Sequence, residues 1–297
     1  DFEAFAVDGD TITESVEALQ HDQSHNSGYC NSLVQVDSDT YALATVGKNN
    51  KTPVVVTFTI PSDGSSITKV TEIATGAGQN ACSAPPNNNS LIQVDSDTYA
   101  WAHQGDAATG SVLTTLTINA DGTGSKVESL THDSTGGGSN SLVQVDSDTY
   151  ALAYAGKNTD GFISTFTIDS DGNITAVKTQ SEGNNLEHDT NHGQYNSLVQ
   201  VDSDTYALSY MGDGNKGYIS TFTIDSSGNI TAVKTQSEGN NLEHTAAPEG
   251  GSASAAIESS SLVQVDSDTY ALAYTGTDND GFISTFTIDS DGNITAV

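Results

Sequence analysis

Ten carboxylates recur as pairs in one short turn that occurs five times along the chain. Each copy has the sequence Val-Asp-Ser-Asp-Thr, and both aspartates are present every time. Hard cations such as calcium prefer oxygen ligands, so these turns are candidate metal sites. The alternative, which we favour, is a plain hairpin turn, because Asp and Ser stabilise turns by bonding their own backbone. The candidate metal ligands are Asp37, Asp39, Asp95, Asp97, Asp146, Asp148, Asp202, Asp204, Asp266 and Asp268.

A second acidic turn looks more like a calcium loop but varies between its copies. One copy is Asp169-Ser170-Asp171-Gly172-Asn173, whereas Pro61 and Asn119 replace its first aspartate elsewhere. A ligand loop would keep its carboxylates, whereas a bulged turn needs only its glycine at positive φ. We therefore predict a turn here. No cofactor is required by the sequence, and calcium is a candidate.

Histidine recurs in the stretches that link the repeats. Three of these histidines are followed by aspartate. Two links read His-Asp-x-x-His, with His21 and His25 in one and His188 and His192 in the other, and such histidine pairs could hold zinc or copper. Because the pattern recurs once per repeat, we favour a structural hydrogen bond that ties each link to its repeat. No Ser or Cys has a recognisable base nearby, and no single asymmetric set of groups stands out, so catalysis is not expected.

One further recurring position, two residues before a fixed glycine, is variable: it is Thr45 in the first repeat and His or Tyr in the other four. Tyrosine rings beside Asp- and Asn-rich loops could stack on sugar faces, and repeated weak sites would add avidity. The alternative is that these rings belong to the core. Together with the link histidines, the candidate ligand-binding residues are His103, Tyr154, Tyr210, Tyr274, His21, His132, His188 and His244.

The elements that must position these residues are set by internal repeats. The segment Ser-Leu-Val-Gln-Val-Asp-Ser-Asp-Thr-Tyr-Ala starts at residues 32, 141, 197 and 261, and a variant starts at 90. In one repeat, runs rich in Val, Ile, Thr, Tyr and Phe predict strands at 141–145, 149–155, 162–168 and 173–178. No stretch has a sustained 3.6-residue apolar period, so essentially no helix is expected. Four short antiparallel strands per repeat are typical of a β-propeller blade.

The order of parts resembles WD40-type blades, although the Trp-Asp ending is missing. A Leu-x-His stretch precedes the first strand, and Asp160-Gly161 comes just before the third. We therefore predict an all-β fold, a single β-propeller domain over residues 1–297 with five full repeats. Residues 1–17 add a hairpin, Phe2–Val16, that matches strands three and four of a blade. Six blade positions are favoured, and a five-bladed ring is the alternative.

Alternation within the second strand predicts how the blades pack. Tyr150, Leu152 and Tyr154 share one side of the strand, while Ala151 and its neighbours at 153 and 155 share the other. A large side that packs on the small side of the next blade would fill the space between twisted sheets.

Charge excludes several classes of partner. The chain has 39 acidic and 8 basic residues and a formal net charge of −31. Nucleic acid and anionic membrane surfaces would be repelled, and no apolar run is long enough for membrane insertion. Two cysteines, Cys30 and Cys82, lie in successive links and could form a disulfide, with two free thiols as the alternative.

The function expected from these features is a non-catalytic extracellular or cell-surface module that binds a glycan or a protein. It could also assemble with itself through the open half-blade. One alternative is a propeller enzyme that acts on glycans. The other is a structural surface protein stabilised by cations or salt.

Overall fold

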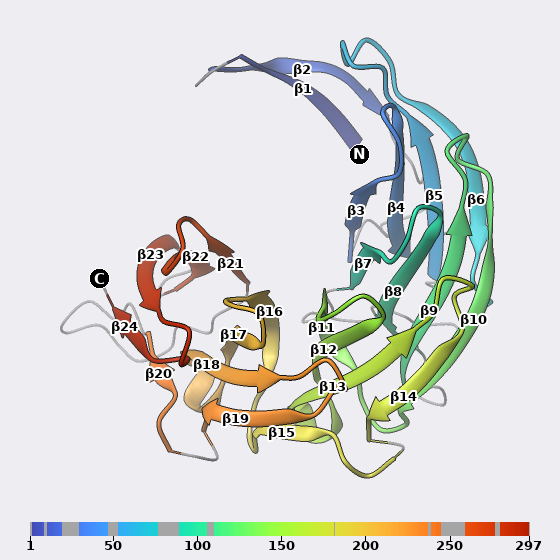
Figure 1. Cartoon of the computed structure of the whole chain (residues 1–297). Helices are drawn as coiled ribbons and strands as arrows, with labels where there is room; N and C mark the ends of the chain where they lie inside the picture. The colour runs from blue at the N-terminus through green and yellow to red at the C-terminus, as the bar shows by residue number, and fades with distance from the viewer. Residues whose placement is uncertain are drawn as a thin grey trace.

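A computed structural model describes residues 2–8, 11–19, 30–46, 53–76, 89–105, 110–180, 182–236, 239–244, 259–276 and 280–296. It confirms an all-β, propeller-type fold. Antiparallel sheets stand side by side around an arc, with their first strands on the concave side (Figure 1). Within the described residues no helix is long and apolar enough to cross a membrane.

Five complete blades follow an N-terminal hairpin. The hairpin consists of β1 (Phe2–Asp8) and β2 (Thr11–Leu19). The first blade contains β3 (Ser32–Gln35), β4 (Thr40–Val46), β5 (Pro53–Thr59) and β6 (Thr68–Ala74). The second contains β7 (Ser90–Gln93), β8 (Thr98–Gln104), β9 (Ser111–Ile118) and β10 (Gly124–Asp133).

The third and fourth blades have a split outer strand. The third contains β11 (Gly138–Gln144), β12 (Thr149–Ala155), β13 (Gly161–Ile168), β14 (Ile174–Lys178) and β15 (Leu186–Asp189). The fourth contains β16 (Gln194–Gln200), β17 (Thr205–Met211), β18 (Gly217–Ile224), β19 (Ile230–Lys234) and β20 (Leu242–Glu243). The fifth contains β21 (Ser260–Gln264), β22 (Thr269–Thr275), β23 (Gly281–Ile288) and β24 (Ile294–Ala296). The only helical segments in the described residues are the 3₁₀ turns η1 (Lys157–Thr159) and η2 (Asp213–Asn215).

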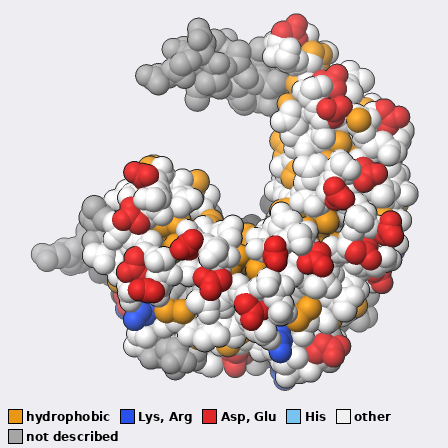
Figure 2. Space-filling model, viewed as in Figure 1, with side chains coloured by type: hydrophobic (Ala, Val, Ile, Leu, Met, Phe, Trp, Pro, Cys, Tyr) orange, Lys and Arg blue, Asp and Glu red, His pale blue; other side chains and the backbone are white. Residues whose placement is uncertain are grey.

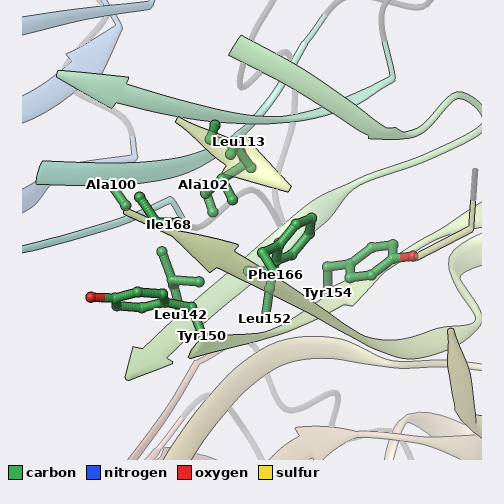
Figure 3. Close-up of a cluster of buried hydrophobic side chains, with 10 residues drawn as sticks. Ala100, Ala102, Leu113, Leu142, Tyr150, Leu152, Tyr154, Phe166 and Ile168 are labelled. Carbon is green, nitrogen blue, oxygen red and sulfur yellow. The ribbon is translucent and has the colours of Figure 1, made fainter. Parts of the chain in front are cut away.

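The predicted packing of a large side on a small side is confirmed. Ala100 and Ala102 of the second blade lie against Tyr150, Leu152 and Tyr154 of the third (Figure 3). The same arrangement joins the third blade to the fourth and the fourth to the fifth. The small alanine side lets the sheets approach, and the large side fills the space that their twist opens.

Three hydroxyl groups reinforce each junction between blades. In the junction of the third and fourth blades, the Leu198 amide donates to Ser141 Oγ at 3.0 Å. Thr149 Oγ1 donates to the Ser226 carbonyl, and Thr165 Oγ1 donates to the Gly228 carbonyl, both at 2.8 Å. The last contact explains the fixed turn glycine. It has positive φ in all five blades, and a Cβ at 228 would lie 2.9 Å from Thr165 Oγ1.

The arc in Figure 1 is open between the fifth blade and the hairpin. Five complete blades and a separate two-stranded sheet agree with the repeats counted in the sequence. The number of blade positions in a closed ring stays a prediction, as does the division of the chain into one domain.

Candidate functional site

The paired aspartates of the Val-Asp-Ser-Asp-Thr turns are exposed and act within their own turns. Asp37 Oδ1 accepts the Ser38 amide at 2.7 Å, and the Asp39 carbonyl accepts the Ile60 amide at 2.7 Å. The other four copies repeat both contacts. Figure 2 shows acidic side chains spread over the visible side of the arc.

Among the described residues, no group of three or more ligating side chains is arranged to hold a metal ion. Calcium binding at these turns therefore stays a prediction, and their observed contacts are those of a hairpin turn.

The link histidines are buried rather than presented at a surface. His132 and His188 are fully buried and pack edge-on against Tyr154 and Tyr210. Neither ring nitrogen of these two residues has a hydrogen-bond partner in the described part of the chain. Burial lowers the pKa of both histidines to about 3, so the rings are neutral.

The hydrogen bond expected of the link histidine is made by the aspartate that follows it. Asp133 Oδ1 accepts the Thr135 amide at 2.7 Å, and Asp189 Oδ1 accepts the Asn191 amide at 3.0 Å. The expectation is thus corrected, because aspartate ties the link while histidine packs beneath it. His244 is also buried, and His21 lies outside the described residues.

The candidate aromatic residues are also part of the core. Tyr154, Tyr210 and His103 are almost fully buried, and Tyr274 is buried in the fifth blade. The rings that remain partly exposed are one layer further out: Phe162 stacks on Tyr154 at 5.8 Å, and Tyr218 stacks on Tyr210 at 5.9 Å. Binding of a ligand by His103 and the three tyrosines stays a prediction. In this structure their side chains are buried and present no surface to a ligand.

In the third and fourth blades, the same carboxylates require the glycine that lies two residues after the aromatic position. A Cβ at Gly156 would lie 2.9 Å from Asp133 Oδ2 and 2.6 Å from the Phe162 ring. At Gly212 the corresponding distance to Asp189 Oδ2 is 2.7 Å. No other residue leaves room for the link to close over the blade.

We expect Gly161→Ala to destabilise the protein by about 2 kcal/mol or more, because its Cβ would lie 2.3 Å from His188 Cε1. Gly281 occupies the same position in the fifth blade and has nothing within 4 Å of a new Cβ. Gly281→Ala should therefore change the free energy of unfolding by less than about 0.5 kcal/mol. Urea unfolding of both variants checks this, and equal effects would contradict the described packing.

Cys30 is in a disulfide bond, which agrees with one of the two predicted alternatives. Cys82, the other cysteine of the sequence, lies outside the described residues.

One position breaks the symmetry of the repeats. Residues 161–188 and 217–244 differ only at two places, yet the residue before them is Asp160 in the third blade and Lys216 in the fourth. Lys216 Nζ lies 2.8 Å from Glu243 Oε1. The counterparts of this ion pair in the third blade are Asp160 and Glu187, which we call the carboxylate pair. The fourth blade thus has an ion pair at the position where the third blade has two acidic side chains.

The carboxylate pair lies among further ionisable groups. Burial, then Asp160 and Asp189, raise the pKa of Glu187. Burial also raises the pKa of Asp160, although His192 and Lys157 favour its ionised form. Carboxyl groups that repel one another at partial burial keep protons at higher pH than usual.

An aromatic surface adjoins the pair. Phe162 and Glu187 are directly opposite one another across β13 and β15, so their side chains lie on the same side of the sheet. The Phe162 ring is partly exposed above Tyr154. An apolar ring face beside two carboxyl groups is a suitable surface for a sugar.

The loop that carries Asp160 is held in an unusual conformation. Asn158 and Thr159 have φ values of 59° and 72°, and positive φ is rare for a β-branched residue. The Gly193 amide donates to the Thr159 carbonyl at 2.8 Å. Such backbone persists only where surrounding structure imposes it, so the next link fixes the position of Asp160.

Sequence reasoning missed the carboxylate pair and Phe162. The sequence predictions rested on the residues that the repeats share. The carboxylate pair is indicated instead by a difference, Asp160 in one segment and Lys216 in its nearly identical copy. The contact with Glu187 also depends on β15 pairing with β13, and the four-strand pattern did not include β15.

No protein-family model and no curated protein matches the chain. Solved structures share its fold at low sequence identity. A periplasmic gluconolactonase from Pseudomonas aeruginosa has a TM-score of 0.69 and 14% identity, over 99% of this chain and 77% of its own. A functionally unknown protein from Desulfotomaculum acetoxidans has a TM-score of 0.60 and 8% identity, over 99% and 74%. A Lactobacillus plantarum protein has a TM-score of 0.59 and 13% identity, over 86% and 67%.

These comparisons correct the functional expectation. The sequence was interpreted as a non-catalytic binding or assembly module, whereas the first of these structures with the same fold is an enzyme. That finding favours the alternative, a propeller enzyme, over the non-catalytic module. At these identities the likeness shows the fold alone, and the fold is that of a β-propeller.

Proposed function

We propose that the protein is a hydrolase acting on carbohydrate, with Asp160 and Glu187 as its acid–base pair. The observation that carries the proposal is the exchange between blades. The fourth blade has a Lys216–Glu243 ion pair, and the third has two carboxyl groups in its place. Two like charges beside one another weaken a fold slightly, so a chemical role accounts for their position better than a structural one.

The chemistry follows from the protonation of the pair. Hydrolysis of a glycosidic bond needs one carboxylic acid that protonates the leaving oxygen and one carboxylate that activates water or attacks the sugar. Both pKa values are raised, and one ionised member favours the proton on the other. One group therefore donates and the other accepts in the same step.

The neighbouring groups have supporting roles. Phe162 offers the ring face on which a sugar packs beside the pair. Asp189 is buried and contributes to the raised pKa of Glu187. His192 interacts with Asp160 and favours its ionised form, which makes Asp160 the proton acceptor and Glu187 the donor.

In this proposal the protein acts outside the cytoplasm. Three observations support that location: the disulfide at Cys30, the acidic composition and the shared fold with a periplasmic enzyme. Disulfides persist in oxidising compartments.

The test is an assay of the purified protein with aryl galactosides, aryl glucosides and glucono-δ-lactone. We expect turnover of at least one glycoside, which Asp160→Asn and Glu187→Gln both abolish and Glu243→Gln leaves unchanged. Glu243→Gln is the matched control for Glu187→Gln, because Glu243 is the counterpart of Glu187 in the fourth blade. Turnover of the lactone alone, lost in Asp160→Asn, would keep the site and change the reaction. Turnover that Asp160→Asn does not affect would refute the site.

A further inference from the structure

The outer side of the fifth blade is the largest departure from the repeat pattern. Residues 281–297 have the same sequence as 161–177. Ile163 is fully buried in the third blade, whereas its counterpart Ile283 is 78% exposed. The same residue type in the same local sequence therefore has opposite surroundings, and the cause lies outside the blade.

Further apolar side chains share this exposure. Val263 and Val265 are 55% and 64% exposed, and Ala273 is also exposed. Their counterparts in the third blade are buried or half-buried under the fourth blade. We call the side of the fifth blade formed by Val263, Val265, Ala273 and Ile283 the end face. A contiguous apolar patch of this kind marks an interaction surface.

Polar groups on the end face are also arranged for a neighbour. In the fourth blade, Ser197 Oγ accepts the Leu262 amide at 2.9 Å, and Thr221 Oγ1 donates to the Gly292 carbonyl at 2.8 Å. Thr205 Oγ1 donates to the Ser290 carbonyl at 2.7 Å. The equivalent hydroxyls of the fifth blade are those of Ser261, Thr285 and Thr269. Within the described residues, none of the three makes this bond to another blade.

We propose that the end face is a docking surface for one further blade of the same repeat type. That blade would lie on the fifth blade as the fifth lies on the fourth, with a Tyr-x-Leu-x-Tyr strand against Ala271, Ala273 and Ile283. It would also supply a leucine amide to Ser261 and turn carbonyls to Thr269 and Thr285. The proposal rests on continuity with the established junctions and is independent of the proposed catalytic site.

A second copy of this chain does not supply the required surface. The large sides of its blades are already covered. Tyr99, Tyr150, Tyr206 and Tyr270 are fully buried, and in the first blade Leu43 is buried and Tyr41 is half-buried. A net charge of −31 also opposes self-association. The occupant that we propose is therefore one further blade of this repeat type and not a second copy of the chain.

The test extends the chain with its own repeat. A second copy of residues 178–234 is joined after Val297, which continues the sequence as it continues after residue 177. We expect the melting midpoint to rise by several degrees and Ile283→Ala to become as destabilising as Ile163→Ala. In the 297-residue chain, Ile283→Ala should have almost no effect. If Ile283→Ala remains without effect in a folded extended chain, the proposal is wrong.

A second measurement does not depend on folding of the extension. The 297-residue protein should be monomeric at micromolar concentration and should bind a dye for exposed apolar surface. Ile283→Asp should reduce the dye signal without changing the molecular mass. A dimer that Ile283→Asp dissociates would show that a second copy occupies the end face, and it would overturn the proposal.

Discussion

Asp160→Lys should lower the kcat/KM for carbohydrate hydrolysis at least about a hundredfold, the usual loss when an acid–base group is removed. The fourth blade shows what the new side chain will do. Lys216 pairs with Glu243 in a segment that is almost identical. A lysine at 160 would pair with Glu187 in the same way and keep it ionised, so the pair would lose both its acceptor and its shared proton.

This substitution separates chemistry from stability better than removal of the carboxylate alone. The Lys216–Glu243 pair is about half exposed, and exposed ion pairs contribute about 0–1 kcal/mol to folding. The unfolding midpoint of Asp160→Lys should therefore stay equal or rise slightly. The steady-state rates and the thermal melt are measured on the same preparation.

A reversed substitution provides the matched control. Lys216→Asp would place two carboxyl groups in the fourth blade and should raise the pKa of Glu243, with hydrolysis unchanged. If Asp160→Lys and Lys216→Asp reduced activity equally, the loss would come from altered surface charge and the carboxylate pair would not be the site.

The fold was predictable because it depends on local patterns repeated many times. Alternation of Tyr150, Leu152 and Tyr154 with alanines fixes which side of a strand is large, and five copies of one turn fix the strand spacing. Each copy supplies the same information, so an error in one blade would be corrected by the others. The positive φ of the turn glycines followed from the same comparison of copies.

The candidate site was not predictable by the same route, for a physical reason. A site needs asymmetry, and the repeats conceal it. Asp160 forms a candidate site only together with Glu187. The split outer strand β15 brings Glu187 opposite Phe162. The burial of His188 likewise depends on the link closing over Gly161, a contact between residues 27 positions apart that no strand pattern contains. Side-chain types suggested ligands there, whereas packing made them core.

The protein should lose stability steeply as the pH falls below about 6.5. The folded-state pKa values of His132 and His188 are lowered to about 3, and those of His103 and His244 to about 4, in each case mainly by burial. Unfolded histidine takes up a proton near pH 6.5. Below that pH the unfolded state binds more protons, so the free energy of unfolding falls by about 1.4 kcal/mol per pH unit for each buried histidine.

Three carboxyl groups oppose this loss. Asp160, Glu187 and Asp189 have raised pKa values, so their protonation favours the folded state as the pH falls through those values. Their window begins at the unfolded carboxyl pKa values of about 4, whereas the histidine window begins at about 6.5. Between pH 6.5 and 5 the histidines therefore decide the slope.

His188→Phe tests the assignment through the slope and not through the absolute stability. Phenylalanine keeps an aromatic ring against Tyr210 and Phe222 but removes the titrating group. Its packing cost is the same at every pH, whereas the loss of one histidine should reduce the slope by about 1.4 kcal/mol per pH unit. Urea unfolding at pH 7, 6 and 5 gives both slopes. A flat profile in the unsubstituted protein would mean that these rings accept protons in the folded state, and the buried neutral layer beneath the links would be wrong.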